Sequence, residues 1–377
     1  MSVWSSLRRR EEDVAFLACV IASLAACAWI VYHVQSPLGD LIGLHSDHLH
    51  HVRATWTFWK LGFEVYRTPF GITAPQAPYP FVPRAPWPDF PIAYPPGMFA
   101  VFAVPTWVGA TYPTMAPETF AKLTVFWVVL LSHLGLAGVW RALSSVGGGR
   151  SPLLVAIWLL TWRMCLHGFY DAIWVGCAAM SISSLARRRP ELSLIWFAIA
   201  MLVNYRAASI APAAAWAAWQ FLRSDTKVWR KVTIFAATGA VGVLVLWTFW
   251  LFTKGSPPHT SAAYQSAASH LAADKTALAL VWVASGITAL LALGAGDVLV
   301  AITVLWATVL TIPHAGHSWH GTILVGAALL VGATRRPIPV AFLRNVLALW
   351  VVALWELVFD NPLFAVVHDV FFRAKFK

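Results

Sequence analysis

The chain has 377 residues, of which 59% are hydrophobic and only 11% are charged, with a formal net charge of +11. Soluble domains carry about 25% charged residues, and a single soluble core stops growing beyond roughly 250–300 residues. These figures exclude a cytosolic enzyme, a disordered chain and a nucleic-acid-binding protein. They predict an all-α, polytopic membrane protein whose positive charges lie mainly in cytoplasmic loops.

The first apolar segment, 14–34, follows three arginines and is long enough to cross a bilayer, which needs about 20 apolar residues. Because no small-residue cleavage site follows it, we interpret it as a retained span rather than a cleaved signal peptide. The next stretch, 35–96, is the longest that is not apolar. Prolines between 69 and 96 exclude continuous helix there, whereas 46–61 lacks proline and predicts one or two short interfacial helices.

The remainder of the chain alternates apolar segments with short polar breaks. The segments are 97–112, 119–140, 152–166, 171–186, 191–203, 207–222, 232–252, 276–293, 298–313, 319–333 and 338–358. Neither a repeat nor a linker divides them, so residues 1–377 form a single predicted domain. The cysteines lie mostly in apolar stretches, and we interpret them as core residues rather than disulfide or metal ligands.

The basic loops at 187–189, 223–231 and 335–336 are expected to be cytoplasmic. Counting every segment as a crossing breaks this topology once between 97 and 170. One of the two short segments, 97–112 or 152–166, must therefore fail to span, which leaves about 11 crossings. A re-entrant 97–112 would make Arg141 and Arg150 cytoplasmic, as the positive-inside rule prefers.

Ionisable residues on the opposite face are expected to mark function, because charge at membrane depth is costly. They occur in five places: 45–89, 167–171, 204–206, 259–274 and 314–320. Sequence alone does not show that these places meet. The short connections between the apolar segments favour one shared cavity at that membrane face.

Several of these motifs carry a family resemblance over roughly residues 14–220. Asp47, Gly62, Tyr66 and the Tyr94-Pro95-Pro96-Gly97 run resemble the first extracytoplasmic loop of GT-C glycosyltransferases, most closely the polyprenol-phosphate-mannose-dependent mannosyltransferases. Residues 167–171 (HGFYD) are similar to the "hGQ.D" segment of that family, with Phe-Tyr in place of the usual Gln-hydrophobic pair. The RRRP run at 187–190 and the NYR run at 204–206 also resemble its later loops.

The resemblance implies a GT-C-like bundle whose catalytic loop is 35–96. It implies inverting transfer of a mannose-like sugar from a polyprenyl-phosphate donor to a hydroxyl of a glycolipid or glycan at the non-cytoplasmic face. The composition, rich in Ala, Arg and Trp, is typical of a GC-rich bacterium. We therefore expect a multi-pass protein of a bacterial inner membrane with a periplasmic active site.

Such a reaction needs a carboxylate as general base and cations that hold the departing phosphate. We assign Asp47 as the base; the alternative is an interfacial helix cap or a partner for His51 at i+4. Arg206 is the phosphate candidate, since a guanidinium suits phosphate, or it snorkels to the interface. Asp171 either orients the acceptor or caps the 171–186 helix.

The other substrate-binding candidates have weaker signals. Lys60, Arg53 and Arg67 either contact phosphate or are solvated loop charges, and Tyr94 either packs at the entry to the next span or contacts substrate. Hydrogen bonds to sugar or phosphate are assigned to three histidines, His167, His314 and His317, and His320 is a further substrate-binding candidate.

Two further interpretations remain open. His48 and His51, spaced i, i+3 beside Asp47, have the spacing of a divalent-metal site, although the resemblance implies an enzyme without a metal or other cofactor. A transporter, a channel or a non-catalytic GT-C-fold subunit is the alternative to an enzyme. The paired broken helices that inverted repeats leave in transporters are not evident in the sequence.

Overall fold

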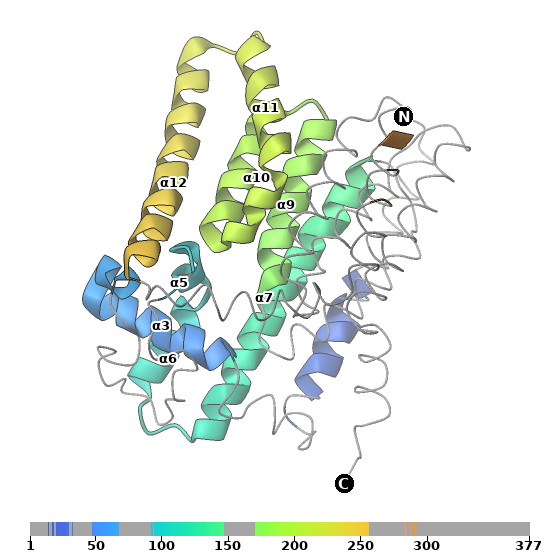
Figure 1. Ribbon diagram of the computed structural model, residues 1–377. Coiled ribbons are helices and arrows are strands. Elements are labelled where there is room, and N and C mark those ends of the chain that lie inside the picture. Colours follow the sequence, from blue (N-terminus) through green and yellow to red (C-terminus); the bar gives the residue numbers. More distant parts are fainter. Residues whose placement is uncertain are drawn as a thin grey trace.

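The computed structural model describes residues 20–29, 47–67, 94–146 and 170–255, together with Ile92 and a few isolated positions. Every element in this part of the chain is a helix, which agrees with the predicted all-α class (Figure 1). An N-terminal helix covers Val20–Trp29. The others are α3 (Asp47–Leu61), η1 (Gly62–Tyr66), α5 (Gly97–Val101), α6 (Ala103–Thr111), α7 (Pro117–Val146), α9 (Asp171–Ala186), α10 (Pro190–Val203), η2 (Tyr205–Ile210), α11 (Ala211–Arg223) and α12 (Val228–Gly255).

Helix α9 packs between α7 and α10, and small residues allow the close approach. A Cβ atom built on Gly176 of α9 would clash with the backbone of Gly135 of α7. On the other side of α9, the Ser181 hydroxyl donates a 2.8 Å hydrogen bond to the carbonyl oxygen of Ser193 in α10. Close backbones and serine hydrogen bonds are typical of helices that associate inside membranes.

A three-residue turn joins α9 to α10. The N–H of Arg189 donates to the Ser184 carbonyl and the N–H of Arg188 to the Leu185 carbonyl, both at 2.9 Å. Arg188 itself has a left-handed backbone with φ of 59°. This is a Schellman ending, in which glycine normally occupies the left-handed position. The predicted break at 187–189 is therefore a tight helical hairpin.

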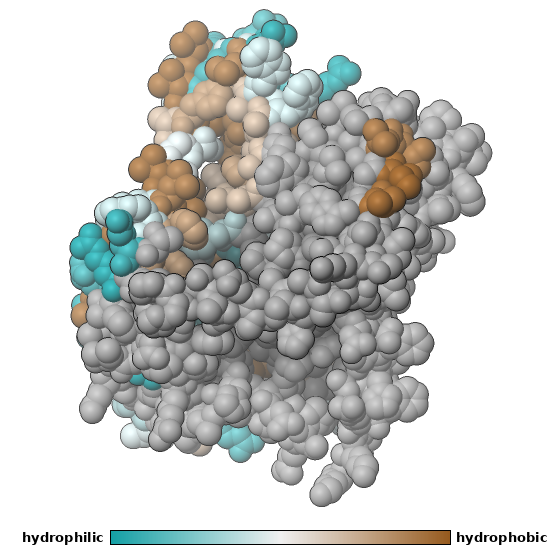
Figure 2. Space-filling model, in the orientation of Figure 1, coloured by the Kyte–Doolittle hydropathy of each residue, from teal (hydrophilic) through white to brown (hydrophobic). Residues whose placement is uncertain are grey.

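Helix α12 is the one helix in the described part of the chain that is long and apolar enough to cross a bilayer. Only 11% of its apolar stretch is buried, whereas the core helix of a soluble protein is mostly covered. Figure 2 shows hydrophobic side chains along this helix between hydrophilic residues at its two ends. The sequence predicted a polar break up to residue 231, but α12 already begins at Val228, so Arg230 and Lys231 lie in its first turn.

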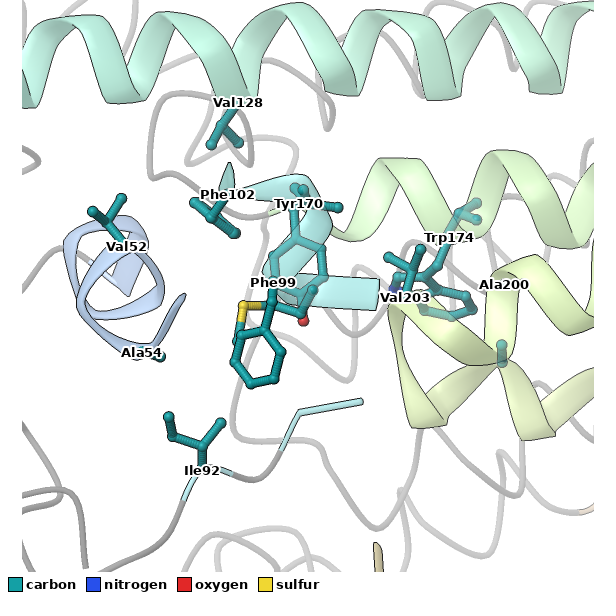
Figure 3. Packing of buried hydrophobic residues seen from close by; sticks show 14 of the residues in the cluster. Val52, Ala54, Ile92, Phe99, Phe102, Val128, Tyr170, Trp174, Ala200 and Val203 are labelled. Atoms are coloured by element: carbon teal, nitrogen blue, oxygen red, sulfur yellow. The ribbon is translucent and has the colours of Figure 1, made fainter. Parts of the chain in front are cut away.

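The bundle of α9–α12 has two ends, which we call the basic end, after its arginines and lysines, and the α3 end, after the helix that lies across it. At the basic end, the α9–α10 turn and the α11–α12 connection lie together, above a small core that includes Leu185, Leu194 and Phe221 (Figure 1). At the α3 end, a larger core joins α3, α5, the start of α9 and the end of α10. Figure 3 shows residues of that core, among them Val52, Phe102 and Val203.

The segment 97–112 is interrupted. Helix α5 ends at Val101 and α6 starts at Ala103, with Phe102 between them outside helical geometry. Even laid end to end, the 15 residues from Gly97 to Thr111 would reach about 22 Å, less than the roughly 30 Å hydrocarbon core. Between the two short segments that could fail to span, this geometry favours 97–112. Segment 152–166 lies outside the described residues.

Candidate functional site

Helix α3 lies across one end of the bundle and carries the sequence from which the base was predicted. The 46–61 stretch forms one helix rather than two, and it begins at Asp47. Its inner face buries His51, Val52 and Thr55. The Thr55 hydroxyl donates to the His51 carbonyl at 2.8 Å, so this buried polar group is satisfied within the helix.

The His51 ring contacts rings from three other parts of the chain. It is 5% exposed, and its centroid lies 4.7 Å from the Tyr94 ring, 4.9 Å from Phe102 and 5.2 Å from Tyr170. These rings come from the proline-rich entry to α5, the α5–α6 break and the residue before α9. We call this set the His51 cluster. Tyr94 is thus a packing partner here, one of the two roles predicted for it.

The His51 cluster brings two predicted site residues to the same end of the bundle. Asp47 precedes His51 by four residues, or about 6 Å along the helix axis. Asp171 directly follows Tyr170 and is the first residue of α9. The structure describes the backbones of both aspartates, and the His51–Tyr170 ring contact brings the first turn of α3 close to the start of α9.

The third predicted place, 204–206, lies at the α3 end because it directly follows α10. Gly97, at the start of α5, lies so close to Leu202 that an added Cβ atom would clash with the Leu202 carbonyl. Asn204 ends α10 and is buried, and η2 follows with Tyr205 and the backbone of Arg206. Of the five predicted places, three have described residues (47–67, 170–171 and 204–206), and these residues converge. The other two, 259–274 and 314–320, lie outside them.

Tyr66 and Tyr205 are polar residues that sequence analysis did not select as ligands. Tyr66 ends η1 and is 0% exposed. Burial raises the pKa of its hydroxyl, and the nearby Tyr205 raises it further. The Tyr205 hydroxyl lies 3.0 Å from Thr248 Oγ1 of α12, and burial raises the pKa of Tyr205 to about 12. Their only sequence signal was membership in the Gly62–Tyr66 and NYR motifs.

The predicted cations of α3 and η1 differ in exposure. The Lys60 amine lies 4.6 Å above the Trp56 ring and is exposed. Arg67 is exposed and pairs with Glu64 at 3.5 Å. Arg53 is half-buried, and burial lowers its pKa. Lys60 and Arg67 thus lie at the rim of this end, whereas Arg53 lies closer to its core.

Within the described residues, no group of three His, Cys, Asp or Glu side chains is placed to hold a metal ion. His51 is enclosed by aromatic rings. The side chain of His48 is not among those described, and His167, His317 and His320 lie outside the described residues. The expectations about a metal and about these histidines therefore stay predictions.

Comparison with models of protein families, with curated proteins and with solved structures found no match for this chain.

Proposed function

We propose that this protein is a multi-pass membrane glycosyltransferase of the GT-C type. It would transfer a mannose-like sugar from a polyprenyl phosphate to a hydroxyl of a glycolipid or glycan at the non-cytoplasmic face. The observation that supports this is the convergence of the starts of α3 and α9 with the end of α10, opposite the basic end. Asp47, Asp171 and the NYR run, which resemble parts of GT-C loops, lie on or directly after these elements, whereas the RRRP run lies at the basic end.

In the proposed reaction Asp47 accepts the proton of the acceptor hydroxyl as its oxygen bonds to the anomeric carbon. The bond from that carbon to the phosphate oxygen breaks with inversion, and the polyprenyl phosphate leaves. Arg206 holds the phosphate as its negative charge increases. Asp171 orients the acceptor, and Arg53 is the further cation that burial makes most effective.

Membrane insertion of the chain is supported by α12 and by the charge distribution. The apolar surface of α12 is exposed along its length, and the arginines at 187–189 and the Arg223–Lys231 stretch lie at one end of the bundle (Figure 1). Short connections rich in Arg and Lys are typical of cytoplasmic loops. The α3 end would then face the periplasm of a bacterial inner membrane.

The test is to incubate the purified full-length protein with a panel of polyprenyl-phosphate sugars, with and without a glycolipid acceptor. We expect one donor to lose its sugar and free polyprenyl phosphate to appear, with no effect of a chelator. Intact donors throughout the panel would contradict transferase activity. Transport of a solute into proteoliposomes, with all donors intact, would establish the transporter alternative instead.

A further inference from the structure

The hydroxyl of Tyr66 is a buried donor for which the described residues offer no hydrogen-bond partner. More than nine in ten buried polar groups in proteins are hydrogen-bonded. A buried hydroxyl without a partner destabilises the folded protein. A group that supplies an acceptor oxygen at this point would remove that penalty.

The hydroxyls of Tyr205 and Thr248 already use their protons in other hydrogen bonds, so the group that pairs with Tyr66 is expected to accept its proton. The Thr248 hydroxyl donates to the Val245 carbonyl at 2.9 Å, and a carbonyl can only accept. Thr248 therefore accepts the bond from Tyr205, whose proton is used in this way. Burial keeps Tyr66 protonated by raising its pKa, so its hydroxyl keeps a proton to donate.

The surroundings of Tyr66 combine this donor with an apolar surface. Phe63 of η1 lies 4.8 Å from the Trp247 ring, and Tyr205 lies 5.5 Å from the Phe249 ring. Together with Leu246, these α12 residues are large exposed hydrophobics. An exposed apolar strip thus ends beside a buried hydrogen-bond donor, and Arg206 is the next residue after Tyr205.

Tyr66 is covered in the structure, and α12 packs against η1, the segment that carries it. Helix α12 packs mainly on α10 and η1, and little of its apolar stretch is buried. Few buried contacts give an element a low free energy of local opening. Outward movement of the C-terminal end of α12 would therefore cost little and would expose the side of η1 against which α12 packs.

We infer that Tyr66 donates a hydrogen bond to a phosphate oxygen of a prenyl phosphate, whose tail lies against Leu246, Trp247 and Phe249 of α12. The inference rests on the proposed function and adds to it a binding residue and a path for the lipid. Phosphate fits better than a sugar hydroxyl because its free oxygens only accept.

The experiment measures ligand binding to the full-length protein in nanodiscs of zwitterionic lipid. The probes are geranylgeranyl phosphate, geranylgeraniol and inorganic phosphate. We expect geranylgeranyl phosphate to bind most tightly. Tyr66→Phe should weaken its binding about tenfold or more, as for a hydrogen bond to a charged group, without changing the binding of geranylgeraniol. Tyr112→Phe, which removes an exposed hydroxyl at the end of α6, is the control and should bind like the wild type.

Thermal unfolding separates ligand binding from a structural role. If the ligand satisfies Tyr66, the unliganded Tyr66→Phe protein should be at least as stable as wild type, and geranylgeranyl phosphate should stabilise it less. Lower stability without ligand, together with an unchanged ligand-induced shift, would show that the hydroxyl is structural. Equal affinity of wild type and Tyr66→Phe, or of phosphate with and without the prenyl tail, would also overturn the inference.

The two proposals fail in different ways. Binding that depends on Tyr66, with no sugar transfer from any donor, would overturn the glycosyltransferase function and leave the lipid-phosphate site standing. Sugar transfer that Tyr66→Phe leaves unchanged at limiting donor would overturn the site and leave the enzyme standing.

Discussion

The two ends of the helical bundle differ in what they bury. The α3 end encloses polar groups, including His51, Asn204 and the Tyr66 hydroxyl, among aromatic rings from several elements. The basic end buries a small apolar core around Phe221 and keeps its charges outside. Burying polar groups is unfavourable unless they are paired. This difference is the one that the proposed function requires, with substrate recognition at the α3 end and orientation in the membrane at the basic end.

The strongest test of this contrast is the side of the membrane that each end faces. Glu64 is exposed at the α3 end and Asp225 at the basic end. In a background without the natural cysteines, Glu64→Cys and Asp225→Cys should react with a membrane-impermeant thiol reagent from opposite sides of oriented vesicles. Because one bilayer separates them, the expected difference is all or none. Labelling of both from the same side would contradict the proposed topology.

Removing the predicted base should affect catalysis at the α3 end alone. Asp47→Asn keeps size and hydrogen bonding but cannot accept a proton, so transfer should fall by at least about 100-fold. Asp225→Asn makes the same change at the basic end and is the matched control. The measurement is sugar release from the donor together with thermal unfolding. Normal turnover in Asp47→Asn would remove Asp47 from its role.

Packing at the α3 end should tolerate less change than the surface of α12. Gly97→Ala places a methyl group against the Leu202 backbone, which cannot move aside as a side chain would. We expect the free energy of unfolding to fall by about 1–3 kcal/mol. The control is Gly239→Ala on α12, where the added Cβ meets nothing within 4 Å. That change should be neutral or stabilise the helix by up to about 1 kcal/mol. Equal effects in the two variants would mean that α5 does not press on α10 as described.

The smallest effect is expected at the basic end. The Lys231 amine donates to the carbonyl oxygens of Leu222, at 2.8 Å, and Ser224, which close the end of α11. Lys231→Met should lower the free energy of unfolding by about 0.5–1 kcal/mol. Lys227→Met, at an exposed position in the same connection, should lower it less. Catalysis at the far end should be unchanged in both, and a loss of transfer would show that the two ends are coupled.

The extents of several helices were predictable because they depend on local pattern. Apolar runs bounded by charged or polar breaks predicted 171–186 and 191–203, and the structure has Asp171–Ala186 and Pro190–Val203. The two 3-10 segments were not predictable, since five or six residues carry too little periodicity. The interruption of 97–112 at Phe102 does have a signal in the sequence that was not used: Pro105 cannot donate to the Val101 carbonyl, and its ring clashes with that carbonyl.

The candidate site was predictable as a set of places but not as an arrangement. The cost of charge in a membrane selected 45–89, 167–171 and 204–206 as places of interest. Their convergence depends on ring contacts such as that of His51 with Tyr170 and on the close approach of Gly97 to Leu202. These contacts join residues far apart in sequence, and hydrophobic periodicity contains no information about them. Tyr66 was given a place in the GT-C-like motif but no binding role, because a single tyrosine in a polar loop carries no pattern that shows it to be buried.

In the turn between α9 and α10, Arg188 has a strained backbone but carries a positive charge. Arg188 occupies the left-handed position of a Schellman ending, where a side chain costs about 1 kcal/mol relative to glycine. Arg188→Gly should therefore stabilise the folded hairpin. In a chain inserted by the positive-inside rule, the same change would remove one of three arginines that hold this turn on the cytoplasmic side during biogenesis. Insertion and folded stability thus place opposite demands on Arg188, and retention of arginine at this position is what selection on insertion would produce.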